Sequence, residues 1–276
     1  PKFQLIASIY RPHSVRSSVV RGQTVAAYKA PIRDMQFILH EVMAAETLFA
    51  QMPGTAEVTT DLMDAILESA AQIAEEVLAP INRSGDEEGC RFEKGQVHTP
   101  TGFREAYKAF AQGGWIGLSG DVDHGGQGMP KMLAVLFEEM IMSANCSFAL
   151  YPILSAGASL ALARHASAAL KQEYLPRLYS GEWSATMCLT EPHAGTDLGI
   201  IKSRAQPQGD GSYLITGTKI FITGGEHDLT RNIVHLVLAK LPDAPPGPKG
   251  ISLFLVPRDL PSAEGARNFS QCDSML

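Results

Sequence analysis

The stretch MCLTEPHAGTDLG, Met187 to Gly199, marks the point where the predicted secondary structure of the chain changes type. Upstream, apolar residues recur at helical spacing, whereas downstream the chain has runs of β-branched and aromatic residues. The stretch itself combines an apolar lead-in with acids, a proline, glycines and threonines. A buried strand needs none of these polar groups, and a surface turn needs no apolar lead-in. Taken alone, the composition fits a well-made turn and a binding site equally, at a domain junction where clefts form.

Three segments upstream of this stretch predict helices. TTDLMDAILESAAQIAEEVLAP begins with Thr59 or Thr60 as its N-cap, and PKMLAVLFEEMIMSAN begins with Pro130 in its first turn. The third, SAALKQEYLPRLYSGEW, is expected to be bounded by Pro176 and Gly181. Apolar residues at helical spacing are expected to lie on one face of each of the first two helices. They are Leu62, Ile66, Ile73 and Val77 in the first helix, and Leu133, Phe137, Met140 and Ile141 in the second.

Three runs downstream predict strands. SYLITGTKIFIT (residues 212–223) follows the turn signal GDG, and the runs RNIVHLVLAK and GISLFLVP are joined by the proline-rich loop LPDAPPGPKG. Helices followed by strands indicate an α+β, multi-domain fold class. They do not fit the alternating strands and helices of a dinucleotide-binding sheet.

Composition and residue spacing exclude several classes of function. With a formal net charge of −6 over 276 residues and no long basic patch, the chain is not expected to bind nucleic acid. The four cysteines lie far apart and the eight histidines do not pair, so neither a disulfide framework nor a metal site is expected. The longest apolar run, residues 148–163, contains Pro152 and falls short of the ~18 residues that a membrane span needs. We expect a buried helix there.

Two stretches supply residues suited to a flat ligand with a polar edge. In MCLTEPHAGTDLG, Gly195 permits close approach of the backbone, while Thr190 and Thr196 offer small hydroxyl groups. In GTKIFITGGEHD (residues 217–228), Phe221 and Thr223 stand two apart on an expected strand and therefore on one face. Such a pair could stack on a ring and hydrogen-bond its edge. Taken by itself, an aromatic residue at this position is more often core than cofactor contact.

Together, these stretches resemble the acyl-CoA dehydrogenase family. The resemblance rests on MCLTEPHAGTDLG followed by GTKIFITGGEHD, with GWIGLSGDVDHGGQGMP (residues 114–130) and EYLPRLYSGEW (residues 173–183) preceding them in order. It extends from about Tyr28 to Gly265. YKAPIRDMQFILHEVMAAE (residues 28–46), with TGGEHDL and IVHLVLAKLPDAP, is similar to a narrower branch, the 3-methylmercaptopropionyl-CoA dehydrogenase-like enzymes.

The resemblance implies an FAD cofactor. The position of Thr196, usually Ser in the family, contacts both the cofactor and the acyl-CoA substrate. Phe221 stands where many members have Trp, and Thr223 matches the residue that hydrogen-bonds the hydride-accepting nitrogen of the flavin. The cofactor-binding residues expected on this basis are Met187, Leu189, Thr190, Gly195, Thr196, Phe221 and Thr223, with Thr196 also binding substrate.

The implied reaction is α,β-desaturation of an acyl-CoA thioester, in which a carboxylate removes the α-proton while the β-hydride passes to flavin. In this family the base is a Glu of a C-terminal helical domain, so no catalytic residue is expected in this chain, which on this view is truncated and inactive alone. Glu191 is interpreted as structural, and Glu226 and Asp228 as turn or surface residues.

The domain organisation implied in this way has four parts. Residues 1–30 are a basic, disordered tail, 31–181 an all-α N-terminal domain, 182–265 an incomplete, β-barrel-like middle domain, and 266–276 an unassigned tail; the C-terminal helical bundle is missing. Residues 1–33 contain no acidic residue, which also fits an organelle transit peptide. We expect a cytoplasmic location, with the mitochondrial matrix as the alternative.

Partners and competing functions follow from the same resemblance. The expected partners are an acyl-CoA substrate, an electron-transfer flavoprotein as electron acceptor, and further copies of the chain in a homo-oligomer of the full-length protein. Two alternatives stay open: a non-catalytic module that binds acyl-CoA, FAD or a full-length partner, and an acyl-CoA oxidase or flavin-dependent monooxygenase of the same architecture.

Overall fold

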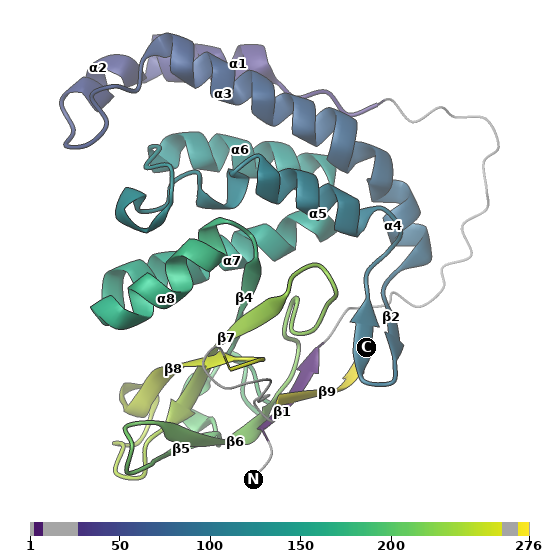
Figure 1. Cartoon of the computed structure of the whole chain (residues 1–276), viewed down its shortest axis with the longest axis vertical. Coiled ribbons are helices and arrows are strands. Elements are labelled where there is room, and N and C mark those ends of the chain that lie inside the picture. The colour runs from purple at the N-terminus through teal and green to yellow at the C-terminus, as the bar shows by residue number, and fades with distance from the viewer. Residues whose placement is uncertain (1–2, 8–26, 261–269, 276) are drawn as a thin grey trace. The chain divides into compact units, whose positions relative to one another are not determined.

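The structure is a computed structural model that describes residues 3–7, 27–260 and 270–275 (Figure 1). The described residues fall into two compact units. The helical unit contains residues 27–89 and 100–181, and the β unit contains residues 3–7, 90–99, 182–260 and 270–275. Helices followed by a sheet are the α+β organisation that the sequence predicts.

The helical unit is built from eight α-helices joined by short helical turns, counted over residues 27–89 and 100–181. Thr59 is the N-cap of the third helix and accepts a hydrogen bond from the Leu62 amide at 3.3 Å. The α-helices are α1 (Ile32–Phe37), α2 (Ala45–Ala50), α3 (Thr60–Gln72), α4 (Asn82–Glu88), α5 (Phe103–Gln112), α6 (Lys131–Ala144), α7 (Cys146–His165) and α8 (Ala168–Tyr179). The π-helical turns are η1 (Ile38–Val42) and η2 (Ile73–Leu78), and the 3-10 turns are η3 (Ala79–Ile81), η4 (Trp115–Gly117) and η5 (Val122–His124).

The core of this unit forms around α6, which contacts α3 and α7 (Figure 1). The face predicted for α6 is confirmed, since its four residues are almost completely buried. The face predicted for the helix that begins with α3 is confirmed only in part. Ile73, in η2, is buried, and Ile66 and Val77 are half-buried. Leu62 is exposed, however, and α3 buries Met63, Leu67 and Ala70. Apolar residues lie on both sides of α3, and contact with α6 decides which side is buried.

Helix α7 confirms the prediction of a helix over the longest apolar run, although it passes through Pro152 without ending. Helix α8 likewise passes through Pro176, so the bound expected there is wrong. In the part of the chain that the structure describes, α7 alone has the length and apolar composition of a membrane-crossing helix. Buried core helices of water-soluble proteins meet the same criteria, and 44% of the α7 window is buried, so this is weak evidence for a membrane span.

The β unit contains a seven-stranded mixed sheet with the order β4-β7-β5-β6-β1-β9, in which β8 also pairs with β7. β4 runs parallel to β7, with Trp183 opposite Asn232, whereas β8 is antiparallel to β7 and β5 to β6. The strands are β1 (Phe3–Ala7), β4 (Trp183–Cys188), β5 (Arg204–Pro207), β6 (Tyr213–Lys219), β7 (Asn232–Lys240), β8 (Ile251–Pro257) and β9 (Ser270–Met275), with 3-10 turns η6 (Leu198–Ile200) and η7 (Pro248–Gly250).

Most of the tail predicted at residues 1–30 lies outside the described residues, whereas residues 270–275 of the unassigned segment 266–276 are described. Phe3–Ala7 and Ser270–Met275 are strands that pair with each other in parallel, and Phe3–Ala7 also pairs with β6. Residues 3–7 are therefore not a disordered segment, and the end of the chain contributes to the sheet.

The expected all-α span contains a β-hairpin, β2 (Arg91–Glu93) and β3 (Gln96–His98), that groups with the β unit. Its two-residue turn is formed by Lys94 and Gly95, both with positive φ, as a type I′ hairpin turn requires. The chain therefore passes between the two units at residues 89/90, 99/100 and 181/182.

Candidate cofactor-binding site

The two segments selected from the sequence lie side by side in the β unit. The Ile220 amide donates a hydrogen bond to the Thr190 carbonyl oxygen at 2.9 Å. One residue earlier on each segment, Lys219 Nζ donates to the Leu189 carbonyl oxygen at 3.1 Å. The end of β4 and the end of β6 are thus joined directly, although about thirty residues separate them along the chain.

Large apolar side chains are exposed at this junction. Met187 is 36% exposed and Phe221 is 57% exposed, whereas Cys188 beside Met187 is fully buried. Alternation along β4 places Met187 on the face opposite Thr186 and Cys188. Exposed apolar surface next to hydroxyl groups fits a flat ligand with a polar edge. Of the other candidates, Leu189, Thr190 and Thr223 are half-buried, and Gly195 and Thr196 are exposed.

The prediction that Phe221 and Thr223 share one face of a strand is wrong, because β6 ends at Lys219. The chain leaves the sheet where the Ile220 amide bonds to Thr190, and Phe221 has a φ of +58°. An L-residue with a Cβ atom is strained in this left-handed region, and such strain concentrates at functional sites. The turn that follows is closed by a hydrogen bond from the Gly225 amide to the Ile222 carbonyl oxygen.

Glu191 and Lys219 form a buried ion pair beneath the junction. Lys219 is fully buried and Glu191 is 4% exposed, with 2.8 Å between Lys219 Nζ and Glu191 Oε1. The carboxylate also accepts from the Lys202 amide at 2.7 Å and from the Ser203 amide at 3.0 Å. The pair thus connects the end of β4, the end of β6 and the segment before β5. Sequence reasoning identified Glu191 as structural but missed Lys219, which no local pattern distinguishes.

The charge on Glu191 is stabilised by these contacts. Burial acts to raise the pKa of the carboxyl group, but hydrogen bonds from Lys219, Ser203 and the Lys202 amide outweigh it and lower the pKa to about 2. A carboxylate with so low a pKa and its lone pairs engaged by donors is a poor proton acceptor. Its environment fits a structural role and does not fit a general base.

The turn after Glu191 is closed by backbone hydrogen bonds in both directions between Glu191 and Ala194, at 2.8 and 3.0 Å. His193 Nε2 lies 3.1 Å from the Ile200 carbonyl oxygen, and Asp197 caps η6 through the Gly199 amide. A Cβ atom added at Gly195 would meet only the Thr190 methyl group, at 3.5 Å. Among the described residues, nothing therefore excludes a side chain at position 195.

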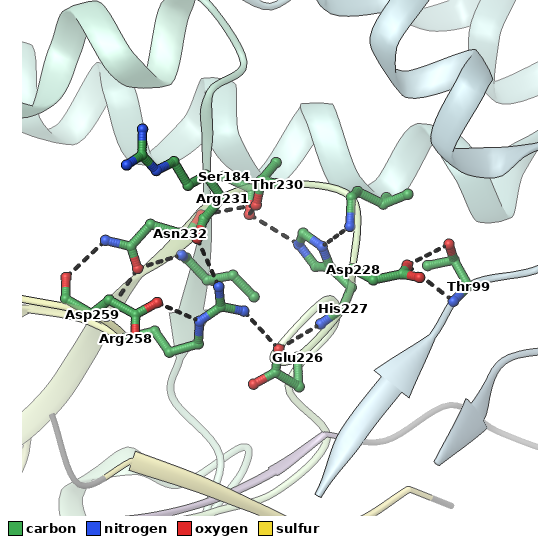
Figure 2. Close-up of polar contacts among 12 residues, drawn as sticks. Thr99, Ser184, Glu226, His227, Asp228, Thr230, Arg231, Asn232, Arg258 and Asp259 are labelled. Carbon is green, nitrogen blue, oxygen red and sulfur yellow. Dashed lines mark hydrogen bonds and ion pairs between the residues drawn. The ribbon is translucent and has the colours of Figure 1, made fainter. Parts of the chain in front are cut away.

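A second polar cluster surrounds the loop formed by residues 224–231 (Figure 2). The Leu229 amide donates to Nδ1 of the buried His227, so the proton of the neutral ring lies on Nε2, which is 2.9 Å from Ser184 Oγ. Ser184 Oγ in turn lies 3.1 Å from Thr230 Oγ1, whose hydroxyl group donates to the Asn232 carbonyl oxygen. Burial, then the charge of Arg258, lowers the His227 pKa to about 3.

This arrangement is a chain of donors rather than a catalytic pair. Because His227 Nε2 donates to Ser184, it cannot accept the hydroxyl proton of that serine, as a Ser–His nucleophile would require. A second buried imidazole, that of His235, lies 2.8 Å from Thr186 Oγ1, and its pKa is lowered to about 3 for the same reasons. The cluster therefore fits a structural role.

Glu226 and Asp228 are turn residues, as expected, but neither lies free at the surface. Their side chains are 19% and 24% exposed. Glu226 forms an ion pair with Arg258 at 2.8 Å, and Asp228 accepts hydrogen bonds from Thr99.

Two domain models of one protein family match the chain, one mainly in the helical unit and one in the β unit. Residues 60–182 match the model of the acyl-CoA dehydrogenase N-terminal domain, and residues 186–271 match that of the acyl-CoA dehydrogenase middle domain. The chain belongs to the acyl-CoA dehydrogenase family. The resemblance found in the sequence is thus confirmed.

Curated acyl-CoA dehydrogenases extend well beyond the matched region. The chain is 45% identical over 251 residues to the 3-methylmercaptopropionyl-CoA dehydrogenase of Ruegeria pomeroyi, which covers 90% of the chain and 42% of that relative. It is 36% identical to a butyryl-CoA dehydrogenase of Syntrophomonas wolfei, covering 87% of the chain and 40% of the relative. The chain thus spans about two fifths of the length of these relatives.

Solved acyl-CoA dehydrogenase structures show the same fold. Butyryl-CoA dehydrogenase from Megasphaera elsdenii matches with a TM-score of 0.58 at 23% identity, over 72% of this chain and 49% of that one. An acyl-CoA dehydrogenase from Bacillus anthracis, solved in complex with FAD, matches with a TM-score of 0.58 at 24% identity, over 75% of this chain and 32% of that one.

Proposed function

We propose that the junction of β4 and β6 binds the isoalloxazine ring of FAD and that the protein acts in α,β-desaturation of an acyl-CoA thioester. The observation that carries this proposal is the direct pairing of the two segments, through the Ile220 amide and the Thr190 carbonyl oxygen. Family membership and the exposed apolar side chains beside it support the proposal.

The chain's own residues have separate roles in this proposal. Phe221 and Met187 cover the ring and exclude water from it, while the Thr223 hydroxyl group donates to its polar edge. Thr196 lies on the exposed turn, where its hydroxyl group contacts cofactor and thioester. FAD, when bound, supplies the hydride acceptor. Exclusion of water also raises the pKa of a nearby carboxyl group, so that its carboxylate form is a stronger proton acceptor.

The base itself is proposed to come from outside the two matched domains. Glu191 is committed to Lys219 and two amides, Glu226 to Arg258, and Asp228 to Thr99. We therefore expect these 276 residues alone to bind flavin without oxidising acyl-CoA. An electron-transfer flavoprotein as acceptor, a homo-oligomeric full-length protein and a cytoplasmic location belong to the same proposal.

Because these three carboxylates are engaged in hydrogen bonds and ion pairs, a second candidate function is also favoured, that of a non-catalytic module that binds FAD or acyl-CoA. Addition of an acyl-CoA to the flavin-loaded protein separates the two. Bleaching of the flavin absorption near 450 nm, the wavelength of its main visible band, indicates hydride transfer. A bound acyl-CoA without bleaching indicates the binding module.

Flavin titration tests the site. FAD is added to the purified chain and binding is followed by the flavin absorption and fluorescence of wild type, Phe221→Ala and Thr223→Val. We expect Phe221→Ala to weaken binding by about tenfold, the equivalent of one aromatic contact. Tyr213→Ala is the matched control, since Tyr213 is an aromatic residue of similar exposure (46%) on β6. Absence of binding by the wild type, or equal affinity in all variants, would contradict the proposed site.

A further inference from the structure

The loop formed by residues 224–231 begins immediately after Thr223 and leads into β7. Its first two residues are Gly224, with a φ of +61°, and Gly225. Glycine loses more conformational freedom on folding than any other residue, so such a pair does not hold a conformation by itself. A local hydrogen bond from the Gly225 amide to the Ile222 carbonyl oxygen closes the turn, and the contacts of the rest of the loop add to it in fixing Thr223.

Arg258, directly after β8, holds one side of this loop. Its Nη1 donates to Glu226 Oε1 at 2.8 Å and its Nη2 donates to the Arg231 carbonyl oxygen at 2.9 Å, so one guanidinium group bridges both ends of the loop (Figure 2). The Nε atom is occupied by Asp259 at 3.2 Å. Glu226 Oε1, which accepts from Arg258, also accepts a hydrogen bond from the His227 amide at 3.1 Å.

Asp228 holds the other side of the loop against the hairpin. Asp228 Oδ1 accepts from the Thr99 hydroxyl group at 2.7 Å and from the Thr99 amide at 3.2 Å (Figure 2). His98 Nδ1 lies 3.8 Å from the second carboxylate oxygen. Thr99 is 8% exposed, and 129 residues separate it from Asp228 along the chain. The hairpin formed by residues 90–99 thus has a specific attachment to the loop that follows Thr223.

We propose that Asp228 is a positioning residue, which through Thr99 fixes the loop of residues 224–231 and so aligns Thr223 and Phe221 with the flavin. The inference rests on the proposed flavin site. Charge-assisted hydrogen bonds are stronger and shorter than neutral ones, and Asp228 accepts two of them from Thr99. Only four residues lie between Thr223 and Asp228, so movement of the anchor reaches the hydroxyl group of Thr223 directly.

Amide hydrogen exchange and FAD titration of matched variants test this role. Asp228→Ala removes the contact, Asp228→Asn keeps Oδ1 as an acceptor, and Thr99→Val removes only the hydroxyl donor. Asp210→Ala is the control, because Asp210 makes the same kind of contact, with the Ser212 hydroxyl group at 2.7 Å and its amide at 2.9 Å, in an exposed turn of the same unit.

For Thr99→Val, which loses one charge-assisted hydrogen bond, we expect exchange of the amides of residues 220–231 to accelerate about tenfold and FAD affinity to fall about tenfold. For Asp228→Ala, which loses two, we expect both effects to be at least as large. Asp228→Asn should keep most of the protection from exchange and most of the FAD affinity, and Asp210→Ala should change neither the exchange rates nor the affinity.

Unchanged exchange in Thr99→Val and Asp228→Ala would overturn the inference, as would faster exchange with unaltered FAD affinity and flavin spectrum. If the wild type binds no FAD, the proposed flavin site fails first, and the alignment role fails with it; the exchange data then show separately whether Asp228 fixes the loop. Thr99→Val keeps the shape of the side chain, so the comparison survives if Asp228→Ala does not fold.

Discussion

Replacement of Lys219 by Met tests how strongly the buried ion pair holds the two segments of the site together. The substitution keeps most of the side-chain volume but removes the cation 2.8 Å from Glu191 Oε1. Glu191 then remains buried without its lysine partner and keeps the Lys202 and Ser203 amides as donors. Removing one partner of a buried pair destabilises proteins by about 3–5 kcal/mol, because the other charge is left uncompensated.

The lowered pKa of Glu191, about 2 against an ordinary value of 4.5, sets the pH dependence of this stabilisation. Because the folded pKa is below the unfolded one, this contribution is complete above about pH 4.5 and is lost as the pH falls toward 2. In Lys219→Met the pKa of Glu191 rises, because burial still raises it and the hydrogen bond from Lys219 no longer lowers it. The difference in stability between wild type and variant is therefore largest at neutral pH and narrows in acid.

Urea denaturation followed by tryptophan fluorescence measures this effect. The chain has two tryptophans, and in a Trp115→Phe background the signal comes from Trp183, which is 6% exposed at the start of β4. Arg83→Met is the control, because Arg83 forms an exposed i,i+4 pair with Glu87 and such pairs contribute little. A loss below about 1 kcal/mol in Lys219→Met, or one that persists unchanged at low pH, would refute this reasoning.

Three further outcomes are expected. Phe221→Gly should raise the free energy of unfolding by about 1 kcal/mol, since glycine relieves the left-handed backbone, while flavin affinity falls; a loss of stability in urea titration would contradict this. Thr59→Ala should cost the helical unit about 1 kcal/mol through loss of the N-cap of α3, measured by far-ultraviolet circular dichroism, with Thr216→Ala on an exposed strand position as comparison. Burial raises the pKa of the Cys188 thiol to about 12, so iodoacetamide at about pH 8 should label exposed Cys146 and spare Cys188 in the native state; equal labelling by mass spectrometry would show that β4 opens.

Sequence patterns predicted the order of elements well, from helices to strands. The buried face of α6 was also predicted correctly, although Val135 and Met142 of the same helix are apolar and exposed. In α3, apolar residues occur around much of the helix, so the periodicity did not decide between Leu62 and Met63. That choice depends on contact with α6, which is information from the tertiary structure.

The hairpin at residues 91–98 carried a usable signal that was overlooked. RFE and QVH flank the dipeptide Lys94-Gly95, and a two-residue turn ending in glycine between short alternating runs is a hairpin pattern. Its three-residue strands are short enough to be obscured by the helices on either side.

Two features of the candidate site had no local signal at all. The end of β6 at Lys219 follows from a hydrogen bond to Thr190 and from the positive φ of Phe221, whereas the sequence continues as a regular strand pattern. The contact between Thr99 and Asp228 joins residues 129 positions apart. Proximity of this kind is set by the topology of the chain, so the candidate residues were recognised from the family resemblance and their supports were not.

The hairpin also limits how this gene can be recombined. Suppose that a chimera takes residues up to about 182, the end of the N-terminal family match, from one relative and the rest from another. Residues 90–99 then come from the first parent, although they belong to the β unit, whose other residues from 182 onward come from the second. Asp228 would then face whatever residue that hairpin supplies at position 99. Chimeras between relatives should therefore keep this contact only where the two parents agree at both of its residues, and engineered swaps should transfer the hairpin together with the strands.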